Sequence, residues 1–200
     1  MAIFKKNPIN IPTASNLIDI PKNGSIVSLA MHINGDIKID DALIIKGEVT
    51  GDIISNSIVV VLENGVVKGN IEAKECRIDG ILTGNIKAIL VEINKSAKVK
   101  GDIFANSALI DGKVDGNINI KESLECTSNA DINTKECKAQ IIVAEGKIDG
   151  FILATKLLDV KKDAAIRGKI FAKELKSDFG CTIEGLVNIY KLDSNLAKLI

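Results

Sequence analysis

The residues of this chain best suited to chemistry are one histidine, His32, and four cysteines, Cys76, Cys126, Cys137 and Cys181. The cysteines stand 50, 11 and 44 residues apart, which matches neither a Cys-x-x-Cys metal knuckle nor a compact disulfide framework. A single histidine cannot supply a three-histidine zinc site within one chain. We therefore expect reduced thiols that pack as small apolar side chains, and no metal or cofactor.

Motifs that bind phosphate groups are also missing from the sequence. It contains neither GxxxxGK[ST] nor GxGxxG, so we expect no nucleotide to be bound. Lys plus Arg and Asp plus Glu both total 26, and this zero formal net charge gives no basic field for nucleic acid. No apolar run approaches the roughly 18 residues of a spanning helix, and the start lacks the apolar core of a signal peptide. A cytoplasmic protein is expected.

The composition changes sharply after the first residues. All three prolines, Pro8, Pro12 and Pro21, fall near the start, and the 179 residues that follow Pro21 contain none. Because proline cannot donate to a β-ladder, the proline-free part suits continuous sheet. We expect a flexible tail over residues 1–25, one β-domain over 26–190, and a cap or tail over 191–200 that includes a short terminal helix.

The β-domain repeats a short motif, small-x-apolar-x-Gly-(Asp/Asn)-Ile. Clear copies end in Gly51-Asp52-Ile53, Gly69-Asn70-Ile71, Gly84-Asn85-Ile86, Gly101-Asp102-Ile103 and Gly116-Asn117-Ile118. Gly35-Asp36-Ile37 opens the series, and divergent copies are centred on Gly150, Gly168 and Gly185. With a hidden copy at Ala130-Asp131-Ile132, the 150 residues from Gly35 to Gly185 contain nine periods of about 17 residues.

A period near 17 residues is too short for a helical hairpin or a propeller blade, and it fits one coil of a parallel β-solenoid. At about 3.3 Å per residue, the coil has a perimeter on the order of 55 Å, enough for three faces. Glycine tolerates positive φ, so we place the corners at Gly51, Gly69, Gly84, Gly101 and Gly116. The repeat is loosest from Cys137 to Glu145, which is either an outward loop or a register change.

The repeated Gly-(Asp/Asn)-Ile coils, preceded by a tail that begins Met1-Ala2-Ile3-Phe4-Lys5-Lys6, resemble the bactofilin family of bacterial cytoskeletal proteins. The resemblance covers about residues 26–190. It implies a right-handed, three-sided β-helix of nine to ten coils that polymerises end to end, without nucleotide, into nonpolar filaments. It also implies work in cell shape with cell-wall enzymes at the cytoplasmic membrane. The repeat region is longer here than a typical family core.

Two groups of residues are predicted to carry these interactions. The resemblance places an aromatic residue at the polymerising C-terminal end, and the candidates here are Phe179, Phe171 and Tyr190, with Phe179 preferred. The tail sets Ile3 and Phe4 beside Lys5 and Lys6, a minimal arrangement for contact with an anionic membrane surface. An inert tail is the alternative.

Other readings of the β-solenoid stay open. One alternative is a capped scaffold that forms no filaments, in which the tail covers the first coil and the terminal helix covers the last. Left-handed hexapeptide-repeat acyltransferases and carbonic-anhydrase-like trimers are solenoid enzymes, but a left-handed hexapeptide helix needs a strict six-residue period. A three-histidine metal site is impossible within this chain, and a single catalytic histidine would have to be His32. The Asp or Asn after each second glycine stabilises a turn or forms a ladder along one corner, and we favour the turn.

Overall fold

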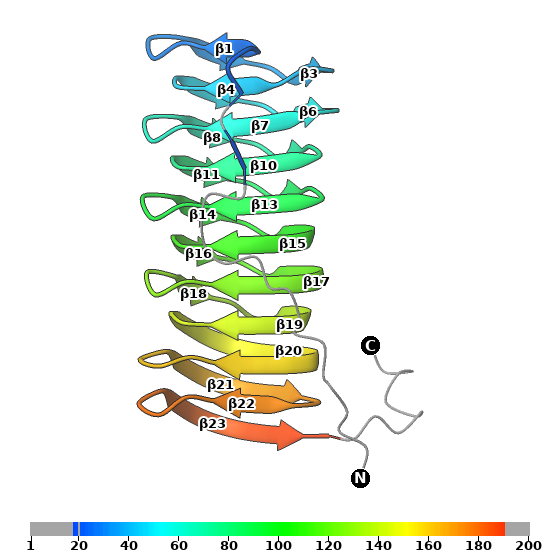
Figure 1. Cartoon of the computed structure of the whole chain (residues 1–200). Helices are drawn as coiled ribbons and strands as arrows, with labels where there is room; N and C mark the ends of the chain where they lie inside the picture. Colours follow the sequence, from blue (N-terminus) through cyan, green and yellow to red (C-terminus); the bar gives the residue numbers. More distant parts are fainter. Residues whose placement is uncertain (1–17, 20, 191–200) are drawn as a thin grey trace.

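The computed structural model describes residues 18, 19 and 21–190, which form a column of ten stacked coils (Figure 1). All 23 strands belong to one sheet, and every pairing is parallel between a strand and its counterpart in the next coil. The predicted parallel β-solenoid with a period near 17 residues is thereby confirmed, and the described residues contain no helix. The predicted terminal helix falls in 191–200, outside the described residues.

Each coil has three faces. Face 1 consists of β1 (Ser25–Val27), β4 (Leu43–Ile45), β7 (Ile58–Val61), β10 (Glu75–Ile78), β13 (Leu90–Ile93) and β22 (Leu175–Ser177), together with the last parts of β15 (Ile103–Ile110), β17 (Ile118–Cys126), β19 (Cys137–Ala144) and β20 (Lys147–Val160). Its ten strands are stacked in register from the first coil to the tenth.

Faces 2 and 3 complete the coil. Face 2 consists of β2 (His32–Asn34), β5 (Glu48–Thr50), β8 (Val66–Lys68), β11 (Ile81–Thr83), β14 (Lys98–Lys100), β16 (Lys113–Asp115), β18 (Asp131–Asn133) and the first parts of β20, β21 (Ala165–Ala172) and β23 (Thr182–Ile189). Face 3 consists of β3 (Ile37–Ile39), β6 (Ile53–Ser55), β9 (Ile71–Glu72), β12 (Ile86–Lys87) and the remaining parts of the long strands.

The interior is a set of aliphatic columns, because side chains alternate between the two sides of each strand. One isoleucine column on face 3 runs through Ile53, Ile71, Ile86, Ile103 and Ile118, which are all buried and stacked in register. Each such side chain contributes roughly 1.5–3 kcal/mol when it is fully buried. That burial depends on the neighbouring coils, so the stability of each coil comes from its neighbours.

The second glycine of each repeat stands at the corner between faces 2 and 3. Gly84 has φ +147°, a conformation that side chains with a Cβ rarely adopt. A Cβ on Gly84 would also collide with the backbone carbonyl oxygen of Gly69 in the coil before it. Both the backbone conformation and the close stacking of coils therefore require glycine at this corner.

The Asp or Asn that follows this glycine forms a ladder between coils. The Asp36 Oδ1 atom accepts a hydrogen bond from the Asp52 N–H at 2.8 Å, and Asp52 Oδ1 accepts one from the Asn70 N–H at 2.7 Å. The series continues to Asn117, whose Oδ1 accepts from Glu136 N–H at 3.1 Å. The preference for a local turn was therefore wrong, since these side chains bind the next coil.

The hidden seventh copy was assigned in the wrong register. Ile132 pairs with Val114 and Ile148 on face 2, so Ala130 occupies the position of the first glycine of a repeat. Thr134 stands at the second-glycine position, since its carbonyl oxygen lies where a Cβ on Gly150 would be. An alanine at the first position of the repeat, which takes a small residue, is easily mistaken for an alanine at the position of the corner glycine.

The loosely repeating stretch from Cys137 is not an outward loop. It forms β19, which continues across two faces and pairs with β17 and β20. The pairing with β20 shifts register between Ala139 and Ile141. Of the two alternatives, the register change is the one that the structure shows, and the corner is turned inside a continuous strand.

Candidate assembly site at the ends of the solenoid

The last described coil exposes part of the apolar interior. Val187 and Ile189 of β23 continue the inward-facing columns of Ile170 and Ala172, which are fully buried in the coil before. Because no described coil follows β23, Val187 is 39% exposed and Ile189 is 50% exposed. The end of the solenoid therefore presents an apolar cross-section.

The backbone at both ends is paired on one side only among the described strands. At the last coil, β23 pairs with β21, and at the first coil β1, β2 and β3 pair with β4, β5 and β6. A parallel strand that lacks a second neighbour offers a row of free backbone donors and acceptors, which is a template for pairing with another chain. Apolar surface and open edges together make the ends suitable for self-association.

The two ends differ in chemistry at the glycine corner. Gly35, in the first coil, is the one corner glycine of the described repeats with open space where a Cβ would lie, and Asp36 begins the ladder there. In the last three coils the ladder position is occupied by Phe151, Lys169 and Leu186. A polar ladder therefore starts at the first coil, and an exposed leucine closes the column at the last.

The three aromatic residues predicted for assembly do not share one location. Phe179 lies in the turn between β22 and β23 and is 98% exposed. Phe171 points outward from face 3 in the ninth coil, where its ring centroid lies 5.4 Å from that of Phe151. Tyr190 directly follows β23, and its N–H donates to the Ala172 carbonyl. Phe179 and Tyr190 belong to the last coil, whereas Phe171 lies on the side.

Val187 and Ile189 were not among the residues predicted for assembly. The signal was present: Val187 follows Gly185 at the spacing at which the inward isoleucine follows the glycine in earlier copies. An inward position in the last copy of a repeat has no following coil to bury it.

The corner glycines Gly51, Gly69, Gly84, Gly101 and Gly116 lie in one column with positive φ.

The cysteines are separate thiols within the solenoid. Burial raises the pKa of Cys76 and of Cys137 to about 12, and burial raises the pKa of Cys126 well above its ordinary value. Cys181, in the last coil, is partly exposed. Because the thiolate is the reactive form, the three buried thiols are shielded both by protonation and by packing.

We expect Ellman's reagent at pH 8 to modify Cys181 within minutes in the folded protein and to leave Cys76, Cys126 and Cys137 unmodified for hours. All four thiols should react in denaturant. Mass spectrometry of peptides from the two samples identifies the modified residues. Rapid modification of Cys126 in the folded protein would contradict the burial described above.

The histidine belongs to a small group of polar contacts on the surface. The exposed His32 lies on face 2, where its Nδ1 is 3.2 Å from Glu48 Oε2, and Glu48 Oε1 accepts a hydrogen bond from Lys68 Nζ at 2.6 Å. Lys68 lowers the pKa of Glu48. Within the described residues, no group of three or more His, Cys, Asp or Glu side chains is placed to hold a metal ion.

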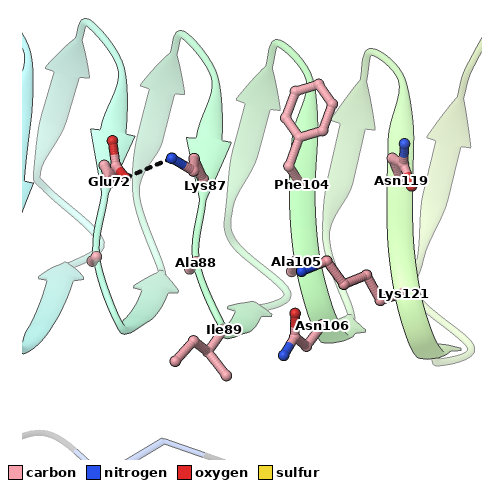
Figure 2. Close-up of a pocket in the computed structure, with 10 residues that line it drawn as sticks. Glu72, Lys87, Ala88, Ile89, Phe104, Ala105, Asn106, Asn119 and Lys121 are labelled. Carbon is pink, nitrogen blue, oxygen red and sulfur yellow. Dashed lines mark hydrogen bonds and ion pairs between the residues drawn. The ribbon is translucent and has the colours of Figure 1, made fainter.

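A depression on face 3 lies beside the exposed ring of Phe104 (Figure 2). Its polar lining includes the ion pair between Lys87 Nζ and Glu72 Oε1 at 2.7 Å, with Asn119 nearby. Lys121 and Asn106 complete its polar lining.

The predicted membrane contact, Ile3, Phe4, Lys5 and Lys6, lies outside the described residues. Among residues 18, 19 and 21–190, the structure has no helix with the length and apolar character needed to cross a bilayer.

Comparison with known proteins agrees with this architecture. The family model Bactofilin, described as polymer-forming cytoskeletal, matches twice, over residues 25–109 and 103–188. Bactofilin BacP of Myxococcus xanthus (strain DK1622) is 31% identical over 76 residues, which are 38% of this chain and 30% of that protein. This chain thus matches less than a third of that relative's length. The solved structures gave no match.

The double match accounts for the unusual length of the repeat region, since the chain contains two successive segments that each fit the family model. Together they cover residues 25–188, from the first strand to the last coil. On this evidence, and with the solenoid fold to support it, the chain belongs to the bactofilin family of polymer-forming cytoskeletal proteins.

Proposed function

We propose that this protein polymerises through the ends of its solenoid into filaments that need no nucleotide. The observation that carries the proposal is the partly exposed Val187 and Ile189 at the last coil, next to the edge of β23 that has no partner among the described strands. Association would bury these side chains and satisfy the backbone groups of the edge strand. Family membership supports self-association as the purpose of this surface.

The filament would serve as a scaffold at the inner face of the cytoplasmic membrane, in cell shape or in the placement of cell-wall enzymes. Support comes from the resemblance and from the tail sequence, where Ile3 and Phe4 adjoin Lys5 and Lys6. One such tail binds an anionic surface weakly, whereas a filament presents many tails and gains avidity. A structural role fits the membership of the chain in a family described as polymer-forming cytoskeletal.

Negative-stain electron microscopy of the purified protein, without nucleotide, tests polymerisation directly. We expect filaments one solenoid wide whose number and length do not change when ATP or GTP is added. Sedimentation over a range of concentrations should show a critical concentration for pelleting. Compact particles at every concentration, with no pelleting, would favour the capped scaffold instead.

A further inference from the structure

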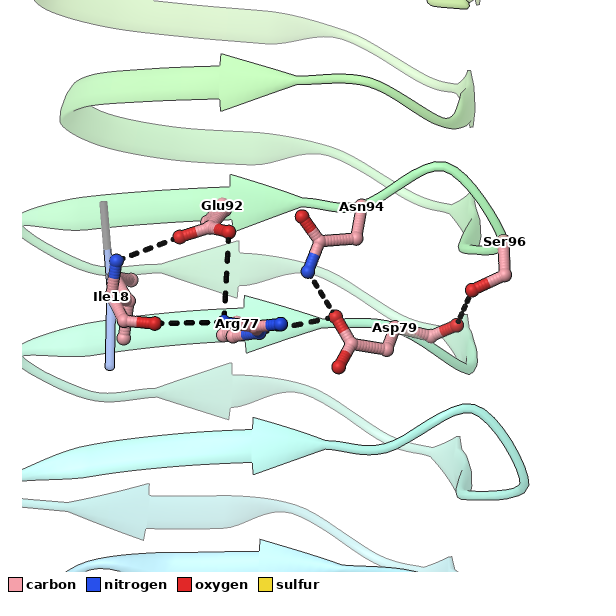
Figure 3. Close-up of polar contacts among 6 residues, drawn as sticks. All are labelled: Ile18, Arg77, Asp79, Glu92, Asn94 and Ser96. Carbon is pink, nitrogen blue, oxygen red and sulfur yellow. Dashed lines mark hydrogen bonds and ion pairs between the residues drawn. The ribbon is translucent and has the colours of Figure 1, made fainter. Parts of the chain in front are cut away.

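An unusual polar cluster lies on the outer surface of face 1, at the fourth and fifth coils. Figure 3 shows Ile18, a residue from far upstream in the chain, beside Arg77 of β10 and Glu92 of β13, which lie in neighbouring coils. The Ile18 N–H donates to Glu92 Oε2 at 2.8 Å, and Arg77 Nη1 donates to the Ile18 carbonyl oxygen at 2.9 Å. Both backbone groups of one residue are therefore held by charged side chains.

This cluster is buried, although its side chains point away from the core. Glu92 is 0% exposed and Ile18 is 1% exposed. Arg77 Nη1 lies 3.8 Å from Glu92 Oε1 and Arg77 Nε lies 3.2 Å from Asp79 Oδ1. Asp79 Oδ1 in turn accepts a hydrogen bond from Asn94 Nδ2. Burial raises the pKa of Glu92. The carboxylate therefore needs its hydrogen bond from the Ile18 N–H and the nearby charge of Arg77 to stay ionised.

The outward column that contains Arg77 and Glu92 continues along face 1. We call this column the outer strip; from the second coil to the ninth it consists of Ile44, Val60, Arg77, Glu92, Leu109, Glu125, Val143 and Asp159. Beyond the cluster, Leu109 and Val143 are each only 5% exposed. By contrast, the outward-facing Ile81 and Phe104 on the other two faces are 43% and 45% exposed.

No described strand lies over face 1, so the burial of Leu109 and Val143 calls for a covering group. The direction of the chain indicates which group that is. Between Ser25 in the first coil and Ile18 at the fourth and fifth coils, the chain runs along face 1 towards the later coils. Leu109 in the sixth coil and Val143 in the eighth lie further along face 1 in the same direction.

Length, apolar content and charge agree with this occupant. Residues 1–17 extend to roughly 55 Å, and the distance from the fifth coil to the tenth, five intervals between strands, is about 25 Å. The segment contains Ile3, Phe4, Ile9, Ile11 and Leu17. Its charged side chains are two lysines, without an acid. The outer strip beyond the cluster contains the acids Glu125 and Asp159, of which Asp159 also pairs with Lys161 Nζ at 2.9 Å.

We propose that residues 1–17 bind the outer strip of their own chain and that Arg77 and Glu92 act as a latch that holds this segment at Ile18. The inference goes beyond polymerisation, because the latch lies on the side of the solenoid and not at its ends. It gives the tail two exclusive states, since apolar side chains bound to the strip cannot also enter a membrane. Release of the latch would expose both the tail and the strip.

The first test reverses the latch charges in the full-length protein. The double variant Arg77→Glu/Glu92→Arg keeps an ion pair between the two coils, but it places an acceptor at the Ile18 carbonyl and a donor at its N–H. Trypsin should then cleave after Lys6 at least tenfold faster than in the wild type, because both hydrogen bonds to charged groups are lost. Hydrogen exchange of the peptide that contains Ile18 should accelerate likewise, while circular dichroism should still show the folded β-solenoid.

The second test leaves the latch intact and changes the strip. Leu109→Asp/Val143→Asp should also accelerate cleavage after Lys6, whereas the matched control Ile81→Asp/Phe104→Asp on the other faces should not. All rates are measured below the concentration at which the protein pellets, so a failure to polymerise leaves the result readable. The proposal would be overturned if trypsin cleaved the wild type, the latch variant Arg77→Glu/Glu92→Arg and the strip variant Leu109→Asp/Val143→Asp at the same rate. It would also be overturned if the protection of Lys6 in the wild type disappeared on dilution, because the strip would then bind the tail of a second copy.

Discussion

Replacing Gly84 by alanine should destabilise the solenoid severely, by about 3–5 kcal/mol. Positive φ at a residue with a Cβ costs on the order of 1–3 kcal/mol. The new Cβ would also meet the carbonyl oxygen of Gly69, and backbone atoms of a stacked coil cannot move aside without disturbing the pairing of β8 with β11. Circular dichroism at increasing temperature, on dilute protein, measures the loss.

Substitutions at two other glycines distinguish the strain of a positive φ from the clash with a stacked coil. Gly35 has φ +137° and Gly180 has φ +93°, but a Cβ on Gly35 has nothing within 4 Å and one on Gly180 has only side-chain atoms at 3.7 Å and beyond. Gly35→Ala and Gly180→Ala should therefore lose only the strain contribution, roughly 2 kcal/mol less than Gly84→Ala. Equal losses at all three positions would mean that close stacking of coils does not restrict the corner.

The fold was predictable because its information is local and repeated. Glycine, a short polar residue and isoleucine recur at nearly constant spacing, and each type has one physical role: a corner, an intercoil hydrogen bond or a core column. Errors arose where one copy departs from the pattern. Around Ala130 and Thr134, two small residues compete for the glycine position, and only the pairing of Ile132 with Val114 decides between them.

The candidate sites were less predictable from the sequence. One depends on the absence of a following coil that would cover a residue, and the other depends on contacts between distant segments. Ile189 has the same type and strand position as buried residues, and only its place in the last coil exposes it. The contact of Ile18 with Glu92 spans 74 residues of sequence. An arginine and a glutamate 15 residues apart in a repeat look like ordinary surface charges until their coils are stacked in register.

The variant Ile189→Lys should abolish filaments at concentrations where the wild type polymerises. In the free protein the lysine side chain can reach water past the open end of the last coil, so the fold should persist. In an end-to-end contact the ammonium group would be buried without a partner, at a cost of several kcal/mol. An increase of at least 100-fold in the critical concentration is expected from sedimentation, with loss of filaments by electron microscopy.

Ile54→Lys is the matched control, because Ile54 is 45% exposed on the side of the solenoid and loses similar apolar area. It should polymerise as the wild type does. Phe179→Arg adds a third comparison, since Phe179 lies at the corner of the same last coil. Loss of filaments in Ile189→Lys but not in Phe179→Arg would place the contact on the open core cross-section. The reverse result would place it at the corner, and normal filaments in both variants would show that the last coil does not form the contact.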